Sequence, residues 1–249
     1  MLLVVVSTEP ATGGGSPPTA ASPHRSIGVL LTAAATPAQV CTAAVVDSTA
    51  GDVIVTAAHC VSGSTRTLLF APAYHAGQTP FGTWIVDRIY VAPEWKARAD
   101  PDSDYAFLVV SASPHNQFGE PVEQVVGGNR LGRTPAVGAQ VSVAGYPIER
   151  SGQSIGCDTR VEQAHGFPEM RCVGFSDGTS GSPMLLDADP VTGRGTITGV
   201  IGGLEAGGCS PDISYMSPFT NTTEQVFKRA ESKSSADPLP LPAPADSCP

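Results

Sequence analysis

The stretch Gly178-Thr179-Ser180-Gly181-Ser182-Pro183 is a turn of small residues around a central serine. Neither glycine carries a Cβ, so the backbone can turn tightly and a second molecule can approach it closely. A serine hydroxyl is a weak nucleophile unless a base lies beside it. The chain supplies a histidine in Thr56-Ala57-Ala58-His59-Cys60 and a carboxylate in Asp104-Tyr105-Ala106-Phe107-Leu108. Together these motifs predict nucleophilic chemistry at Ser180.

Composition narrows the class of protein. The 249 residues include 27 glycines and 23 prolines but only 15% charged residues, which favours short strands and turns over long helices. The net charge of −9 argues against a nucleic-acid partner, because binding phosphates requires clustered Lys and Arg. No run approaches the roughly 20 apolar residues of a membrane span. We therefore expect a soluble all-β protein with no nucleic-acid and no membrane partner.

Short apolar runs separated by turn residues begin at Ser26 and predict two groups of strands. The runs are residues 27–31, 39–46, 52–56, 67–70, 82–91 and 105–110 in the first group, and 140–144, 171–174, 183–186 and 196–201 in the second. We expect one central folded unit over 26–232, with a first barrel over about 26–120, a second over about 121–220 and a site between them. One helix is predicted over about 222–232, capped by Asn221 with Glu224 three residues further on.

The two ends of the chain differ from this central unit. Residues 1–25 are rich in Ser, Thr, Pro, Gly and Ala and predict a disordered N-terminal extension. The apolar start, residues 1–6, has no basic flank and makes a poor signal peptide. Residues 233–249 are rich in proline and predict an extended tail that does not pack as a domain.

His59 and Asp104 stand out from the other titratable residues. His59 follows an apolar run and two alanines, which leave room for its imidazole to turn towards a cleft. Asp104 enters an apolar strand, so its carboxylate lies at the edge of a core and needs a hydrogen-bond partner such as an imidazole. Asp100 and Asp102 are interpreted as solvated loop charges. The remaining histidines lie in polar or proline-containing loops and are given no catalytic role: His24, His75, His115 and His165.

The six cysteines contain no CxxC pair, which disfavours zinc or thiol redox chemistry and favours disulfides in an oxidising compartment. Cys41 and Cys60 lie on consecutive predicted strands, and a bridge between them closes a short loop worth roughly 3 kcal/mol. We therefore expect an extracellular protein without a bound metal.

The motifs of His59, Asp104 and Ser180, in this order, resemble the signatures of trypsin/chymotrypsin-like serine peptidases. The resemblance spans about residues 26–230, and the Ala/Gly/Thr-rich, lysine-poor style is similar to secreted actinobacterial members. It implies a chymotrypsin-like double six-stranded antiparallel β-barrel with a short C-terminal helix. It also implies a triad in which Ser180 is the nucleophile, His59 its base and Asp104 the partner of His59. The N–H groups of Gly178 and Ser180 would then hold the oxyanion.

The remaining cysteines are assigned with less support from the sequence. Cys157 and Cys172 flank a short hairpin-like segment before the nucleophile and are predicted to pair. Cys209 and Cys248 then remain, and a bridge between them would tie the proline-rich tail to the second barrel. A free thiol at Cys209 is the open alternative.

Two positions depart from the familiar pattern of the family. Thr179 stands where digestive members have an aspartate that pairs with a new N-terminal ammonium, so activation by that switch is not expected. The residue six before Ser180, an aspartate in trypsins, is Gly174. An apolar primary pocket is therefore predicted, formed by Gly174, Phe175, Gly202, Gly203 and Leu204. Asp212 would favour basic substrates if it faced inward, whereas Glu205 is interpreted as a solvated charge at the rim.

These interpretations converge on a secreted, monomeric serine endopeptidase that acts on protein or peptide substrates without metal or cofactor. A different class of function stays open, in which a catalytically silent homologue uses the cleft as a protein-binding module. An esterase is disfavoured, because Ser182 stands where the last glycine of the Gly-x-Ser-x-Gly pattern belongs.

Overall fold

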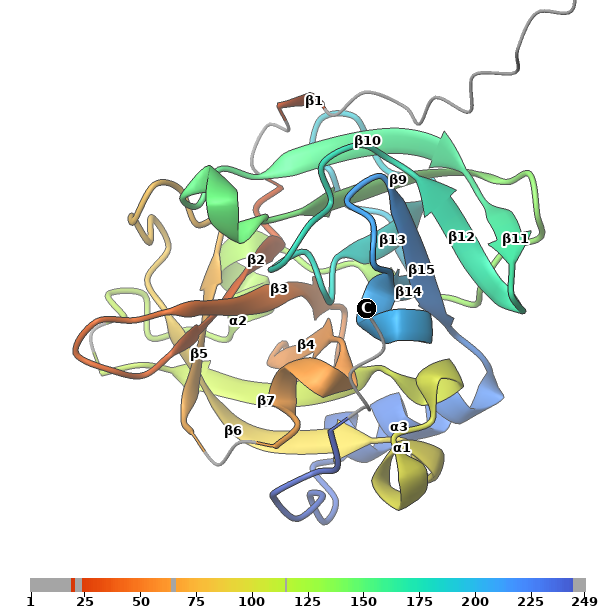
Figure 1. The fold of residues 1–249 in the computed structure, drawn as a ribbon. Helices are drawn as coiled ribbons and strands as arrows, with labels where there is room; N and C mark the ends of the chain where they lie inside the picture. The colour runs from red at the N-terminus through yellow and green to blue at the C-terminus, as the bar shows by residue number, and fades with distance from the viewer. Residues whose placement is uncertain (1–18, 21–23, 64–65, 115, 244–249) are drawn as a thin grey trace, which may run out of the picture.

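The computed structural model describes residues 19–20, 24–63, 66–114 and 116–243 (Figure 1). The strands form two largely antiparallel β units, a closed barrel of six strands and a sheet of nine strands. The predicted all-β architecture with a C-terminal helix is confirmed. Both predicted barrels are present, but the second is a half-barrel rather than the closed six-stranded barrel that the resemblance implied, because the strands at its two ends, β1 and β11, do not pair with each other.

The first barrel is built from the N-terminal half of the chain. Its strands are β2 (Ile27–Thr32), β3 (Gln39–Val46), β4 (Val53–Thr56), β5 (Leu68–Pro72), β6 (Trp84–Val91) and β7 (Ala106–Ala112). They follow the order β2-β3-β4-β7-β6-β5, and the barrel closes where β5 pairs with β2. Gly28 permits this closure, because a Cβ at that position would lie 2.6 Å from the Cα of Pro72.

Alternate residues of the barrel strands contribute to two different cores. Ile54 of β4 packs inside the barrel with Leu30 and Phe70. Its neighbours Val53 and Val55 belong to a second cluster that also contains residues of the open sheet, such as Ala144. Side chains alternate between the two faces of a strand, so β4 is buried on both faces, which explains its unbroken apolar sequence.

The second unit is an open sheet that packs against the first barrel. Its strands are β1 (Thr19–Ala20), β8 (Arg130–Leu131), β9 (Gln140–Gly145), β10 (Ile155–Arg160), β11 (Glu162–Ala164), β12 (Phe167–Arg171), β13 (Pro183–Leu186), β14 (Thr196–Ile201) and β15 (Ile213–Pro218). They run in the order β1-β10-β9-β13-β14-β15-β12-β11, with β8 added alongside β14. The strand predicted over 171–174 is misplaced: β12 ends at Arg171, and Gly174, with φ of +85°, lies in a turn.

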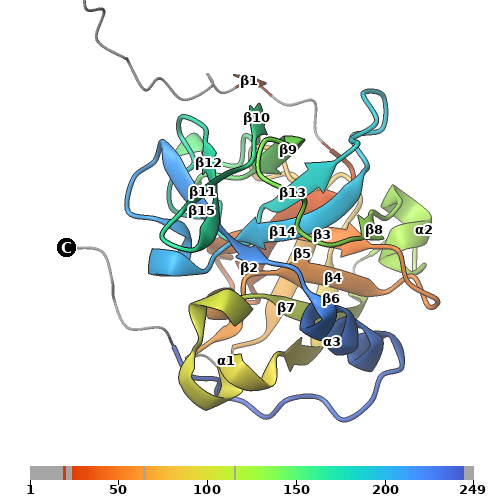
Figure 2. The same ribbon diagram turned by 90° about the vertical axis from the view of Figure 1, so that its right-hand side faces the viewer.

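The C-terminal helix α3 (Asn221–Glu231) carries the chain back from the open sheet to the first barrel (Figure 2). Its cap is Thr220, one residue before the predicted Asn221, and Thr223 rather than Glu224 completes the capping box. The Phe227 ring lies 5.4 Å from the ring of Phe107 on β7. Two shorter helices were not predicted, α1 (Pro93–Arg98) and α2 (Val122–Val126). Within the described residues, no helix has the length and apolar character needed to cross a membrane.

The described part of the proline-rich tail contains no helix or strand after residue 231, and it packs against the first barrel. Asp237 is 7% exposed and its N–H donates to Ile89 O on β6 over 2.9 Å. Further along, Leu241 is buried in the core of the barrel. At the other end of the chain, Thr19–Ala20 pair with β10, whereas most of the extension predicted as disordered lies outside the described residues.

Candidate active site

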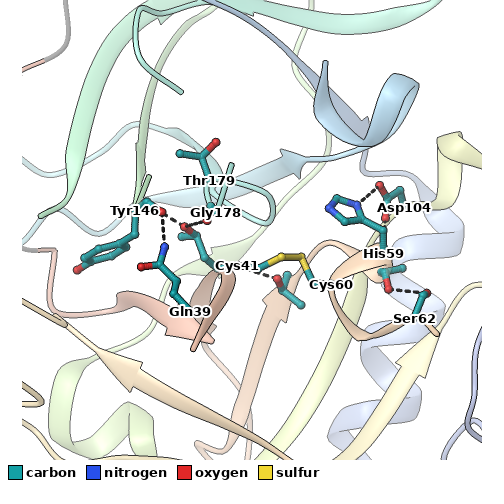
Figure 3. The surroundings of a disulfide bond; sticks show 12 residues. Gln39, Cys41, His59, Cys60, Ser62, Asp104, Tyr146, Gly178 and Thr179 are labelled. Atoms are coloured by element: carbon teal, nitrogen blue, oxygen red, sulfur yellow. Dashed lines mark hydrogen bonds and ion pairs between the residues drawn. A yellow bond between two sulfur atoms is a disulfide. The ribbon is translucent and has the colours of Figure 1, made fainter. Parts of the chain in front are cut away.

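His59 lies in a 3₁₀ turn (Ala58–Val61) directly after β4, at one end of the first barrel. The alanines before it are fully buried, and the Cys41–Cys60 disulfide ties the next residue to β3 (Figure 3). The imidazole itself is 14% exposed. A small-residue run and a crosslink therefore fix the backbone while one edge of the ring stays accessible, as the sequence predicted.

Asp104 lies between the 3₁₀ turn Pro101–Ser103 and β7 and is 1% exposed. Its Oδ2 accepts a hydrogen bond from His59 Nδ1 over 2.7 Å and one from the N–H of Gly203 over 2.9 Å. Its Oδ1 accepts from the backbone N–H of His59 over 2.9 Å. A carboxylate only accepts hydrogen bonds, so Nδ1 of His59 carries a proton and Nε2 is left for the cleft. Asp100 and Asp102 make no contact with His59 among the described hydrogen bonds, in agreement with their interpretation as loop charges.

The environment of His59 shifts its pKa in two opposing directions. Burial alone lowers the pKa, because it disfavours the charged imidazolium. The negative charge of Asp104 and its hydrogen bond to the ring raise it, and together they outweigh burial. The net pKa of His59 therefore lies above its ordinary value of 6.5. The imidazole is thus a stronger base than a free histidine.

Ser180 lies in the turn before β13, on the open sheet, and is partly exposed in the same cleft as His59. Its carbonyl accepts a hydrogen bond from Thr42 N over 2.8 Å, which fastens the turn to β3 of the first barrel. Gly181, with φ of +82°, has no room for a Cβ, which would overlap Thr42 O and Thr56 Oγ1. The described residues contain no hydrogen bond between Ser180 and His59, so the structure brings the two side chains to one cleft without joining them. Catalytic hydrogen bonds often tighten only when substrate binds.

The backbone around Ser180 has two N–H groups without a partner. Within the described part of the chain, neither Gly178 N nor Ser180 N donates a hydrogen bond. The carbonyl on the other side of each of these peptide groups is bonded into the protein: Asp177 O accepts from Ile148 N over 2.8 Å, and Thr179 O from Ser182 N over 2.9 Å. The N–H and C=O of a trans peptide point in opposite directions, so both N–H groups are directed away from these partners.

The cleft at Ser180 has a volume of about 560 Å³, and its walls differ from the prediction. Of the five residues predicted for the primary pocket, only Phe175 lines it. Gly174 lies in the neighbouring turn, Gly202 and Gly203 pack against Asp104 and Phe167, and Leu204 begins the turn that leads into the wall. Ile201 and Glu205, which the sequence placed near the pocket and at its rim, do line the cleft, whereas the sequence analysis missed the rest of the lining: Glu149, Ser176, Asp177 and residues 206–211.

The wall of the cleft contains acidic side chains. Glu205 lines the cleft with Glu149 and Asp177, whereas Asp212 is exposed and does not line it. Ser176 Oγ donates a hydrogen bond to Glu149, which joins two neighbouring positions of the wall. The Gly207–Gly208 pair is the feature of the sequence from which an irregular loop after β14 could have been predicted, and both glycines have positive φ, 112° and 114°.

The disulfide predictions are confirmed where the structure describes both partners. Cys157 pairs with Cys172 as well as Cys41 with Cys60, and no described cysteine is a free thiol. Cys248 lies outside the described residues, so its pairing with Cys209 stays a prediction. Among the described residues, Cys41, His59 and Cys60 are the one group of three potential metal ligands within 4.8 Å. Both cysteines are oxidised, so the group offers only the imidazole to a metal.

A closed barrel and an open sheet that bring His59 and Ser180 to one cleft, with the buried Asp104 bonded to His59, define a protein of the chymotrypsin-like fold. The sequence matches the family model described as Trypsin over residues 6–224, and the chain belongs to this family. A comparison with curated proteins gave no match.

Solved structures with this fold include proteases from microorganisms and one human protein named for heparin binding. Protease Anisep from Arthrobacter nicotinovorans is 20% identical with a TM-score of 0.74, covering 86% of this chain and 99% of its own. The thermostable serine protease AL20 from an extremophilic microorganism is 24% identical with a TM-score of 0.70, covering 84% of this chain and 98% of its own. Human heparin binding protein is 15% identical with a TM-score of 0.60, covering 91% of this chain and 99% of its own.

Proposed function

We propose that this member of the trypsin family is a secreted serine endopeptidase whose triad is Ser180, His59 and Asp104. The observation that carries the proposal is the hydrogen bond of 2.7 Å between His59 Nδ1 and the buried Asp104, in a cleft that also contains Ser180. A binding module needs no buried carboxylate behind a histidine and no small-residue turn around a serine. The family also implies protein substrates.

The proposed chemistry begins with attack of Ser180 Oγ on the carbonyl carbon of the scissile peptide bond. His59 Nε2 takes the hydroxyl proton as the C–O bond forms, and then gives it to the leaving amine as the C–N bond breaks. Asp104 keeps the Nδ1 proton of His59 in place and stabilises the imidazolium; it does not become protonated. Water then attacks the acyl-enzyme by the same steps, releasing the acid and restoring Ser180.

The N–H groups of Gly178 and Ser180 are proposed to hold the oxyanion of the tetrahedral intermediate. Both lack a protein acceptor among the described residues, and both belong to peptide groups whose carbonyls are fixed elsewhere. Donors fixed before the reaction stabilise developing charge without reorganisation, and one such donor contributes about 3 kcal/mol or more.

The primary pocket is proposed to accept an apolar side chain next to Phe175 and Ile201, which are 4% and 3% exposed. Glu149, Asp177 and Glu205 surround this apolar base and repel an acidic side chain. The disulfides Cys41–Cys60 and Cys157–Cys172 support an oxidising, extracellular location. We further propose that the protein acts as a monomer and needs no metal or cofactor.

The alternative function is that of a silent homologue that uses the cleft to bind another protein. One solved structure of this fold carries the name heparin binding protein, so the fold is not restricted to proteins named as proteases. The net charge of −9 works against a polyanionic ligand of that kind. The retained His59–Asp104 hydrogen bond favours the enzyme.

Labelling with a fluorophosphonate probe separates the two functions, because the probe forms a bond only with an activated serine. We expect one adduct on Ser180 in the wild type, none in S180A, and full labelling in the control S111A, which removes an exposed hydroxyl from β7. A folded wild type that gains no adduct and cleaves no peptide library would overturn the peptidase and support the binding module.

A further inference from the structure

Thr42 is a buried residue of β3 that contacts the turn around Ser180 through both its backbone and its side chain. Its N–H donates to Ser180 O over 2.8 Å, and its hydroxyl donates to Gly178 O over 2.9 Å. The hydroxyl also accepts a hydrogen bond from Tyr146 N over 3.0 Å. The residue is 0% exposed, so none of these groups can exchange its partner for bulk water.

Two groups of donors fix the successive carbonyls of residues 177–180, which we call the oxyanion loop. Ile148 N and Ser182 N bind the carbonyls of Asp177 and Thr179, and Thr42 binds the two that alternate with them. Each peptide group of the loop is thus held at its oxygen. Since a peptide plane turns as a unit, fixing every oxygen also fixes the direction of the N–H groups.

The hydroxyl of Thr42 also stabilises the segment that carries Ile148 N, the donor to Asp177 O. It holds Tyr146 N, two residues before the Ile148 N–H that binds Asp177 O. Tyr146 O is in turn held by the side chain of Gln39 over 2.5 Å, as Figure 3 shows. One hydroxyl of the first barrel therefore couples the 146–148 segment to the oxyanion loop.

We propose that Thr42 is the positioning residue of the oxyanion hole, an inference that rests on the proposed peptidase function. Thr42 does not touch the reacting atoms; it holds the loop from the side opposite the cleft. Removal of its hydroxyl leaves Gly178 O and Tyr146 N buried and unpaired, and the loop can regain partners only by turning its peptide groups. The N–H groups of Gly178 and Ser180 then no longer point towards the oxyanion.

This clamp accounts for the absence of an acidic residue before the nucleophile. The hydroxyl of Thr179 bonds within the turn, to Ser176 O over 2.7 Å, and reaches no charged group. The loop is ordered instead by Thr42 of the other β unit, which is present whether or not the chain has been cut. We therefore expect the oxyanion loop to have the same conformation in cleaved and uncleaved protein.

The test compares T42V, which keeps the shape but loses the hydroxyl, with T42S, which restores it. The matched control is T198V, because Thr198 is 1% exposed and its hydroxyl donates to Met184 O over 3.1 Å, away from the oxyanion loop. Rates are divided by the folded fraction from circular dichroism, so a less stable variant still gives an answer. The readouts are kcat, KM and the affinity for a peptide boronic acid, whose tetrahedral adduct places an oxygen in the hole.

We expect T42V to lower kcat about 10- to 100-fold while KM stays within about threefold, because the loss concerns the transition state. Boronic acid affinity should fall by a similar factor, and T42S should recover most of both losses. T198V should lower the melting temperature without this change in kcat. If T42V and T198V have equal kcat, Thr42 is merely structural and the inference is wrong. Failure of wild-type protein to react with the fluorophosphonate would instead reject the peptidase function itself.

Discussion

In the closed barrel, the histidine and the carboxylate are bonded to each other: both carboxylate oxygens of Asp104 accept hydrogen bonds, and Nδ1 of His59 is occupied while Nε2 is left for the cleft. In the open sheet, the parts of the site lie in turns, and the N–H groups of Gly178 and Ser180 have no acceptor among the described residues. In the proposed mechanism the two units therefore have different roles. The first barrel holds the proton-transfer pair in a fixed state, and the second unit presents the N–H donors and the wall that contact the substrate.

The largest effect should come from D104N, which breaks the hydrogen-bonded pair of His59 and Asp104 in the first barrel. The amide can donate to Nδ1 and so favours the wrong tautomer, which should lower kcat/KM about 10⁴-fold. The fold should persist, because an amide fills the same space. The control D102N changes an exposed aspartate of the neighbouring turn and should leave kcat/KM unchanged. A D104N variant with activity near that of the wild type would remove Asp104 from the site.

The same pair gives a pH dependence with a defined sign. The pKa of His59 lies above 6.5 because the charge and hydrogen bond of Asp104 outweigh burial, and only the neutral imidazole can accept the serine proton. Activity should therefore fall as the pH drops through a value above 6.5. NMR titration of His59 in S180A should show this raised pKa, and in S180A/D104N a pKa below 6.5, since burial alone remains. An unchanged pKa in the double variant would contradict the assigned cause.

The junction between the two units is tested by G181A. A Cβ at Gly181 would overlap Thr42 O and Thr56 Oγ1, and the φ of +82° disfavours any L side chain. We expect the free energy of unfolding to fall by about 3 kcal/mol, from strain and overpacking together. G138A is the matched control, because Gly138 has a similar φ of +89° but nothing within 4 Å of its added Cβ. It should cost only about 1 kcal/mol, and equal losses in urea titrations would reject the packing argument.

A smaller effect on the first barrel should follow from D237N. Asp237 accepts hydrogen bonds from Val91 N, Lys96 Nζ and Arg229 NH2 over 2.8–3.0 Å. Burial raises its pKa, but the hydrogen bonds of these groups lower it further, so the net pKa lies below 3.8. D237N should lower the free energy of unfolding by about 2 kcal/mol at neutral pH.

The stabilisation by Asp237 depends on pH in the opposite direction to the stabilisation by a histidine whose pKa is raised. A depressed carboxylate pKa stabilises the fold above the unfolded value of about 3.9, and the gain disappears as the pH falls through the folded pKa. The difference between D237N and wild type should therefore shrink below about pH 4. D87N, which changes an exposed aspartate on β6, should show no such difference at any pH. A constant difference down to pH 2 would show that the charge of Asp237 is not the cause.

The sequence was informative about the first barrel because its strands are short apolar runs with turn residues between them. Residues 39–46 were predicted as a strand with the bounds of β3, and His59 and Asp104 lie together as the motifs indicated. The second unit was predicted less well. Strand β10 carries Gly, Cys and Asp, and β15 follows an irregular loop, so neither shows a clear alternation.

The walls of the cleft could not be predicted because their positions depend on tertiary contacts. Glu205, with φ of 54°, lies in a turn whose direction is set by the glycines after it. Thr42 was assigned only to a strand, since nothing local distinguishes a threonine that bonds across two β units from one that faces solvent. The docked tail depends on the pairing of Asp237 with Arg229 and Lys96, which composition does not reveal.

The smallest expected effect is a difference in kcat/KM between substrates, and it tests whether the wall of the open sheet selects the substrate side chain. Glu149, Asp177 and Glu205 face the cleft around an apolar base, so a substrate carboxylate would enter a site that already carries negative charge. Among matched chromogenic peptides, we expect an apolar residue before the cleaved bond to give the highest kcat/KM, and glutamate a value at least about tenfold lower, a difference of ~1.4 kcal/mol.

The contribution of a single charge of the wall is tested at Glu205. E205Q removes one charge from the wall and should raise cleavage after glutamate while lowering cleavage after arginine. D212N is the control, because Asp212 is exposed outside the cleft lining and should change neither value. If D212N rather than E205Q alters the ratio of cleavage after glutamate to cleavage after arginine, Asp212 belongs to the cleft and the assignment of Glu205 is wrong.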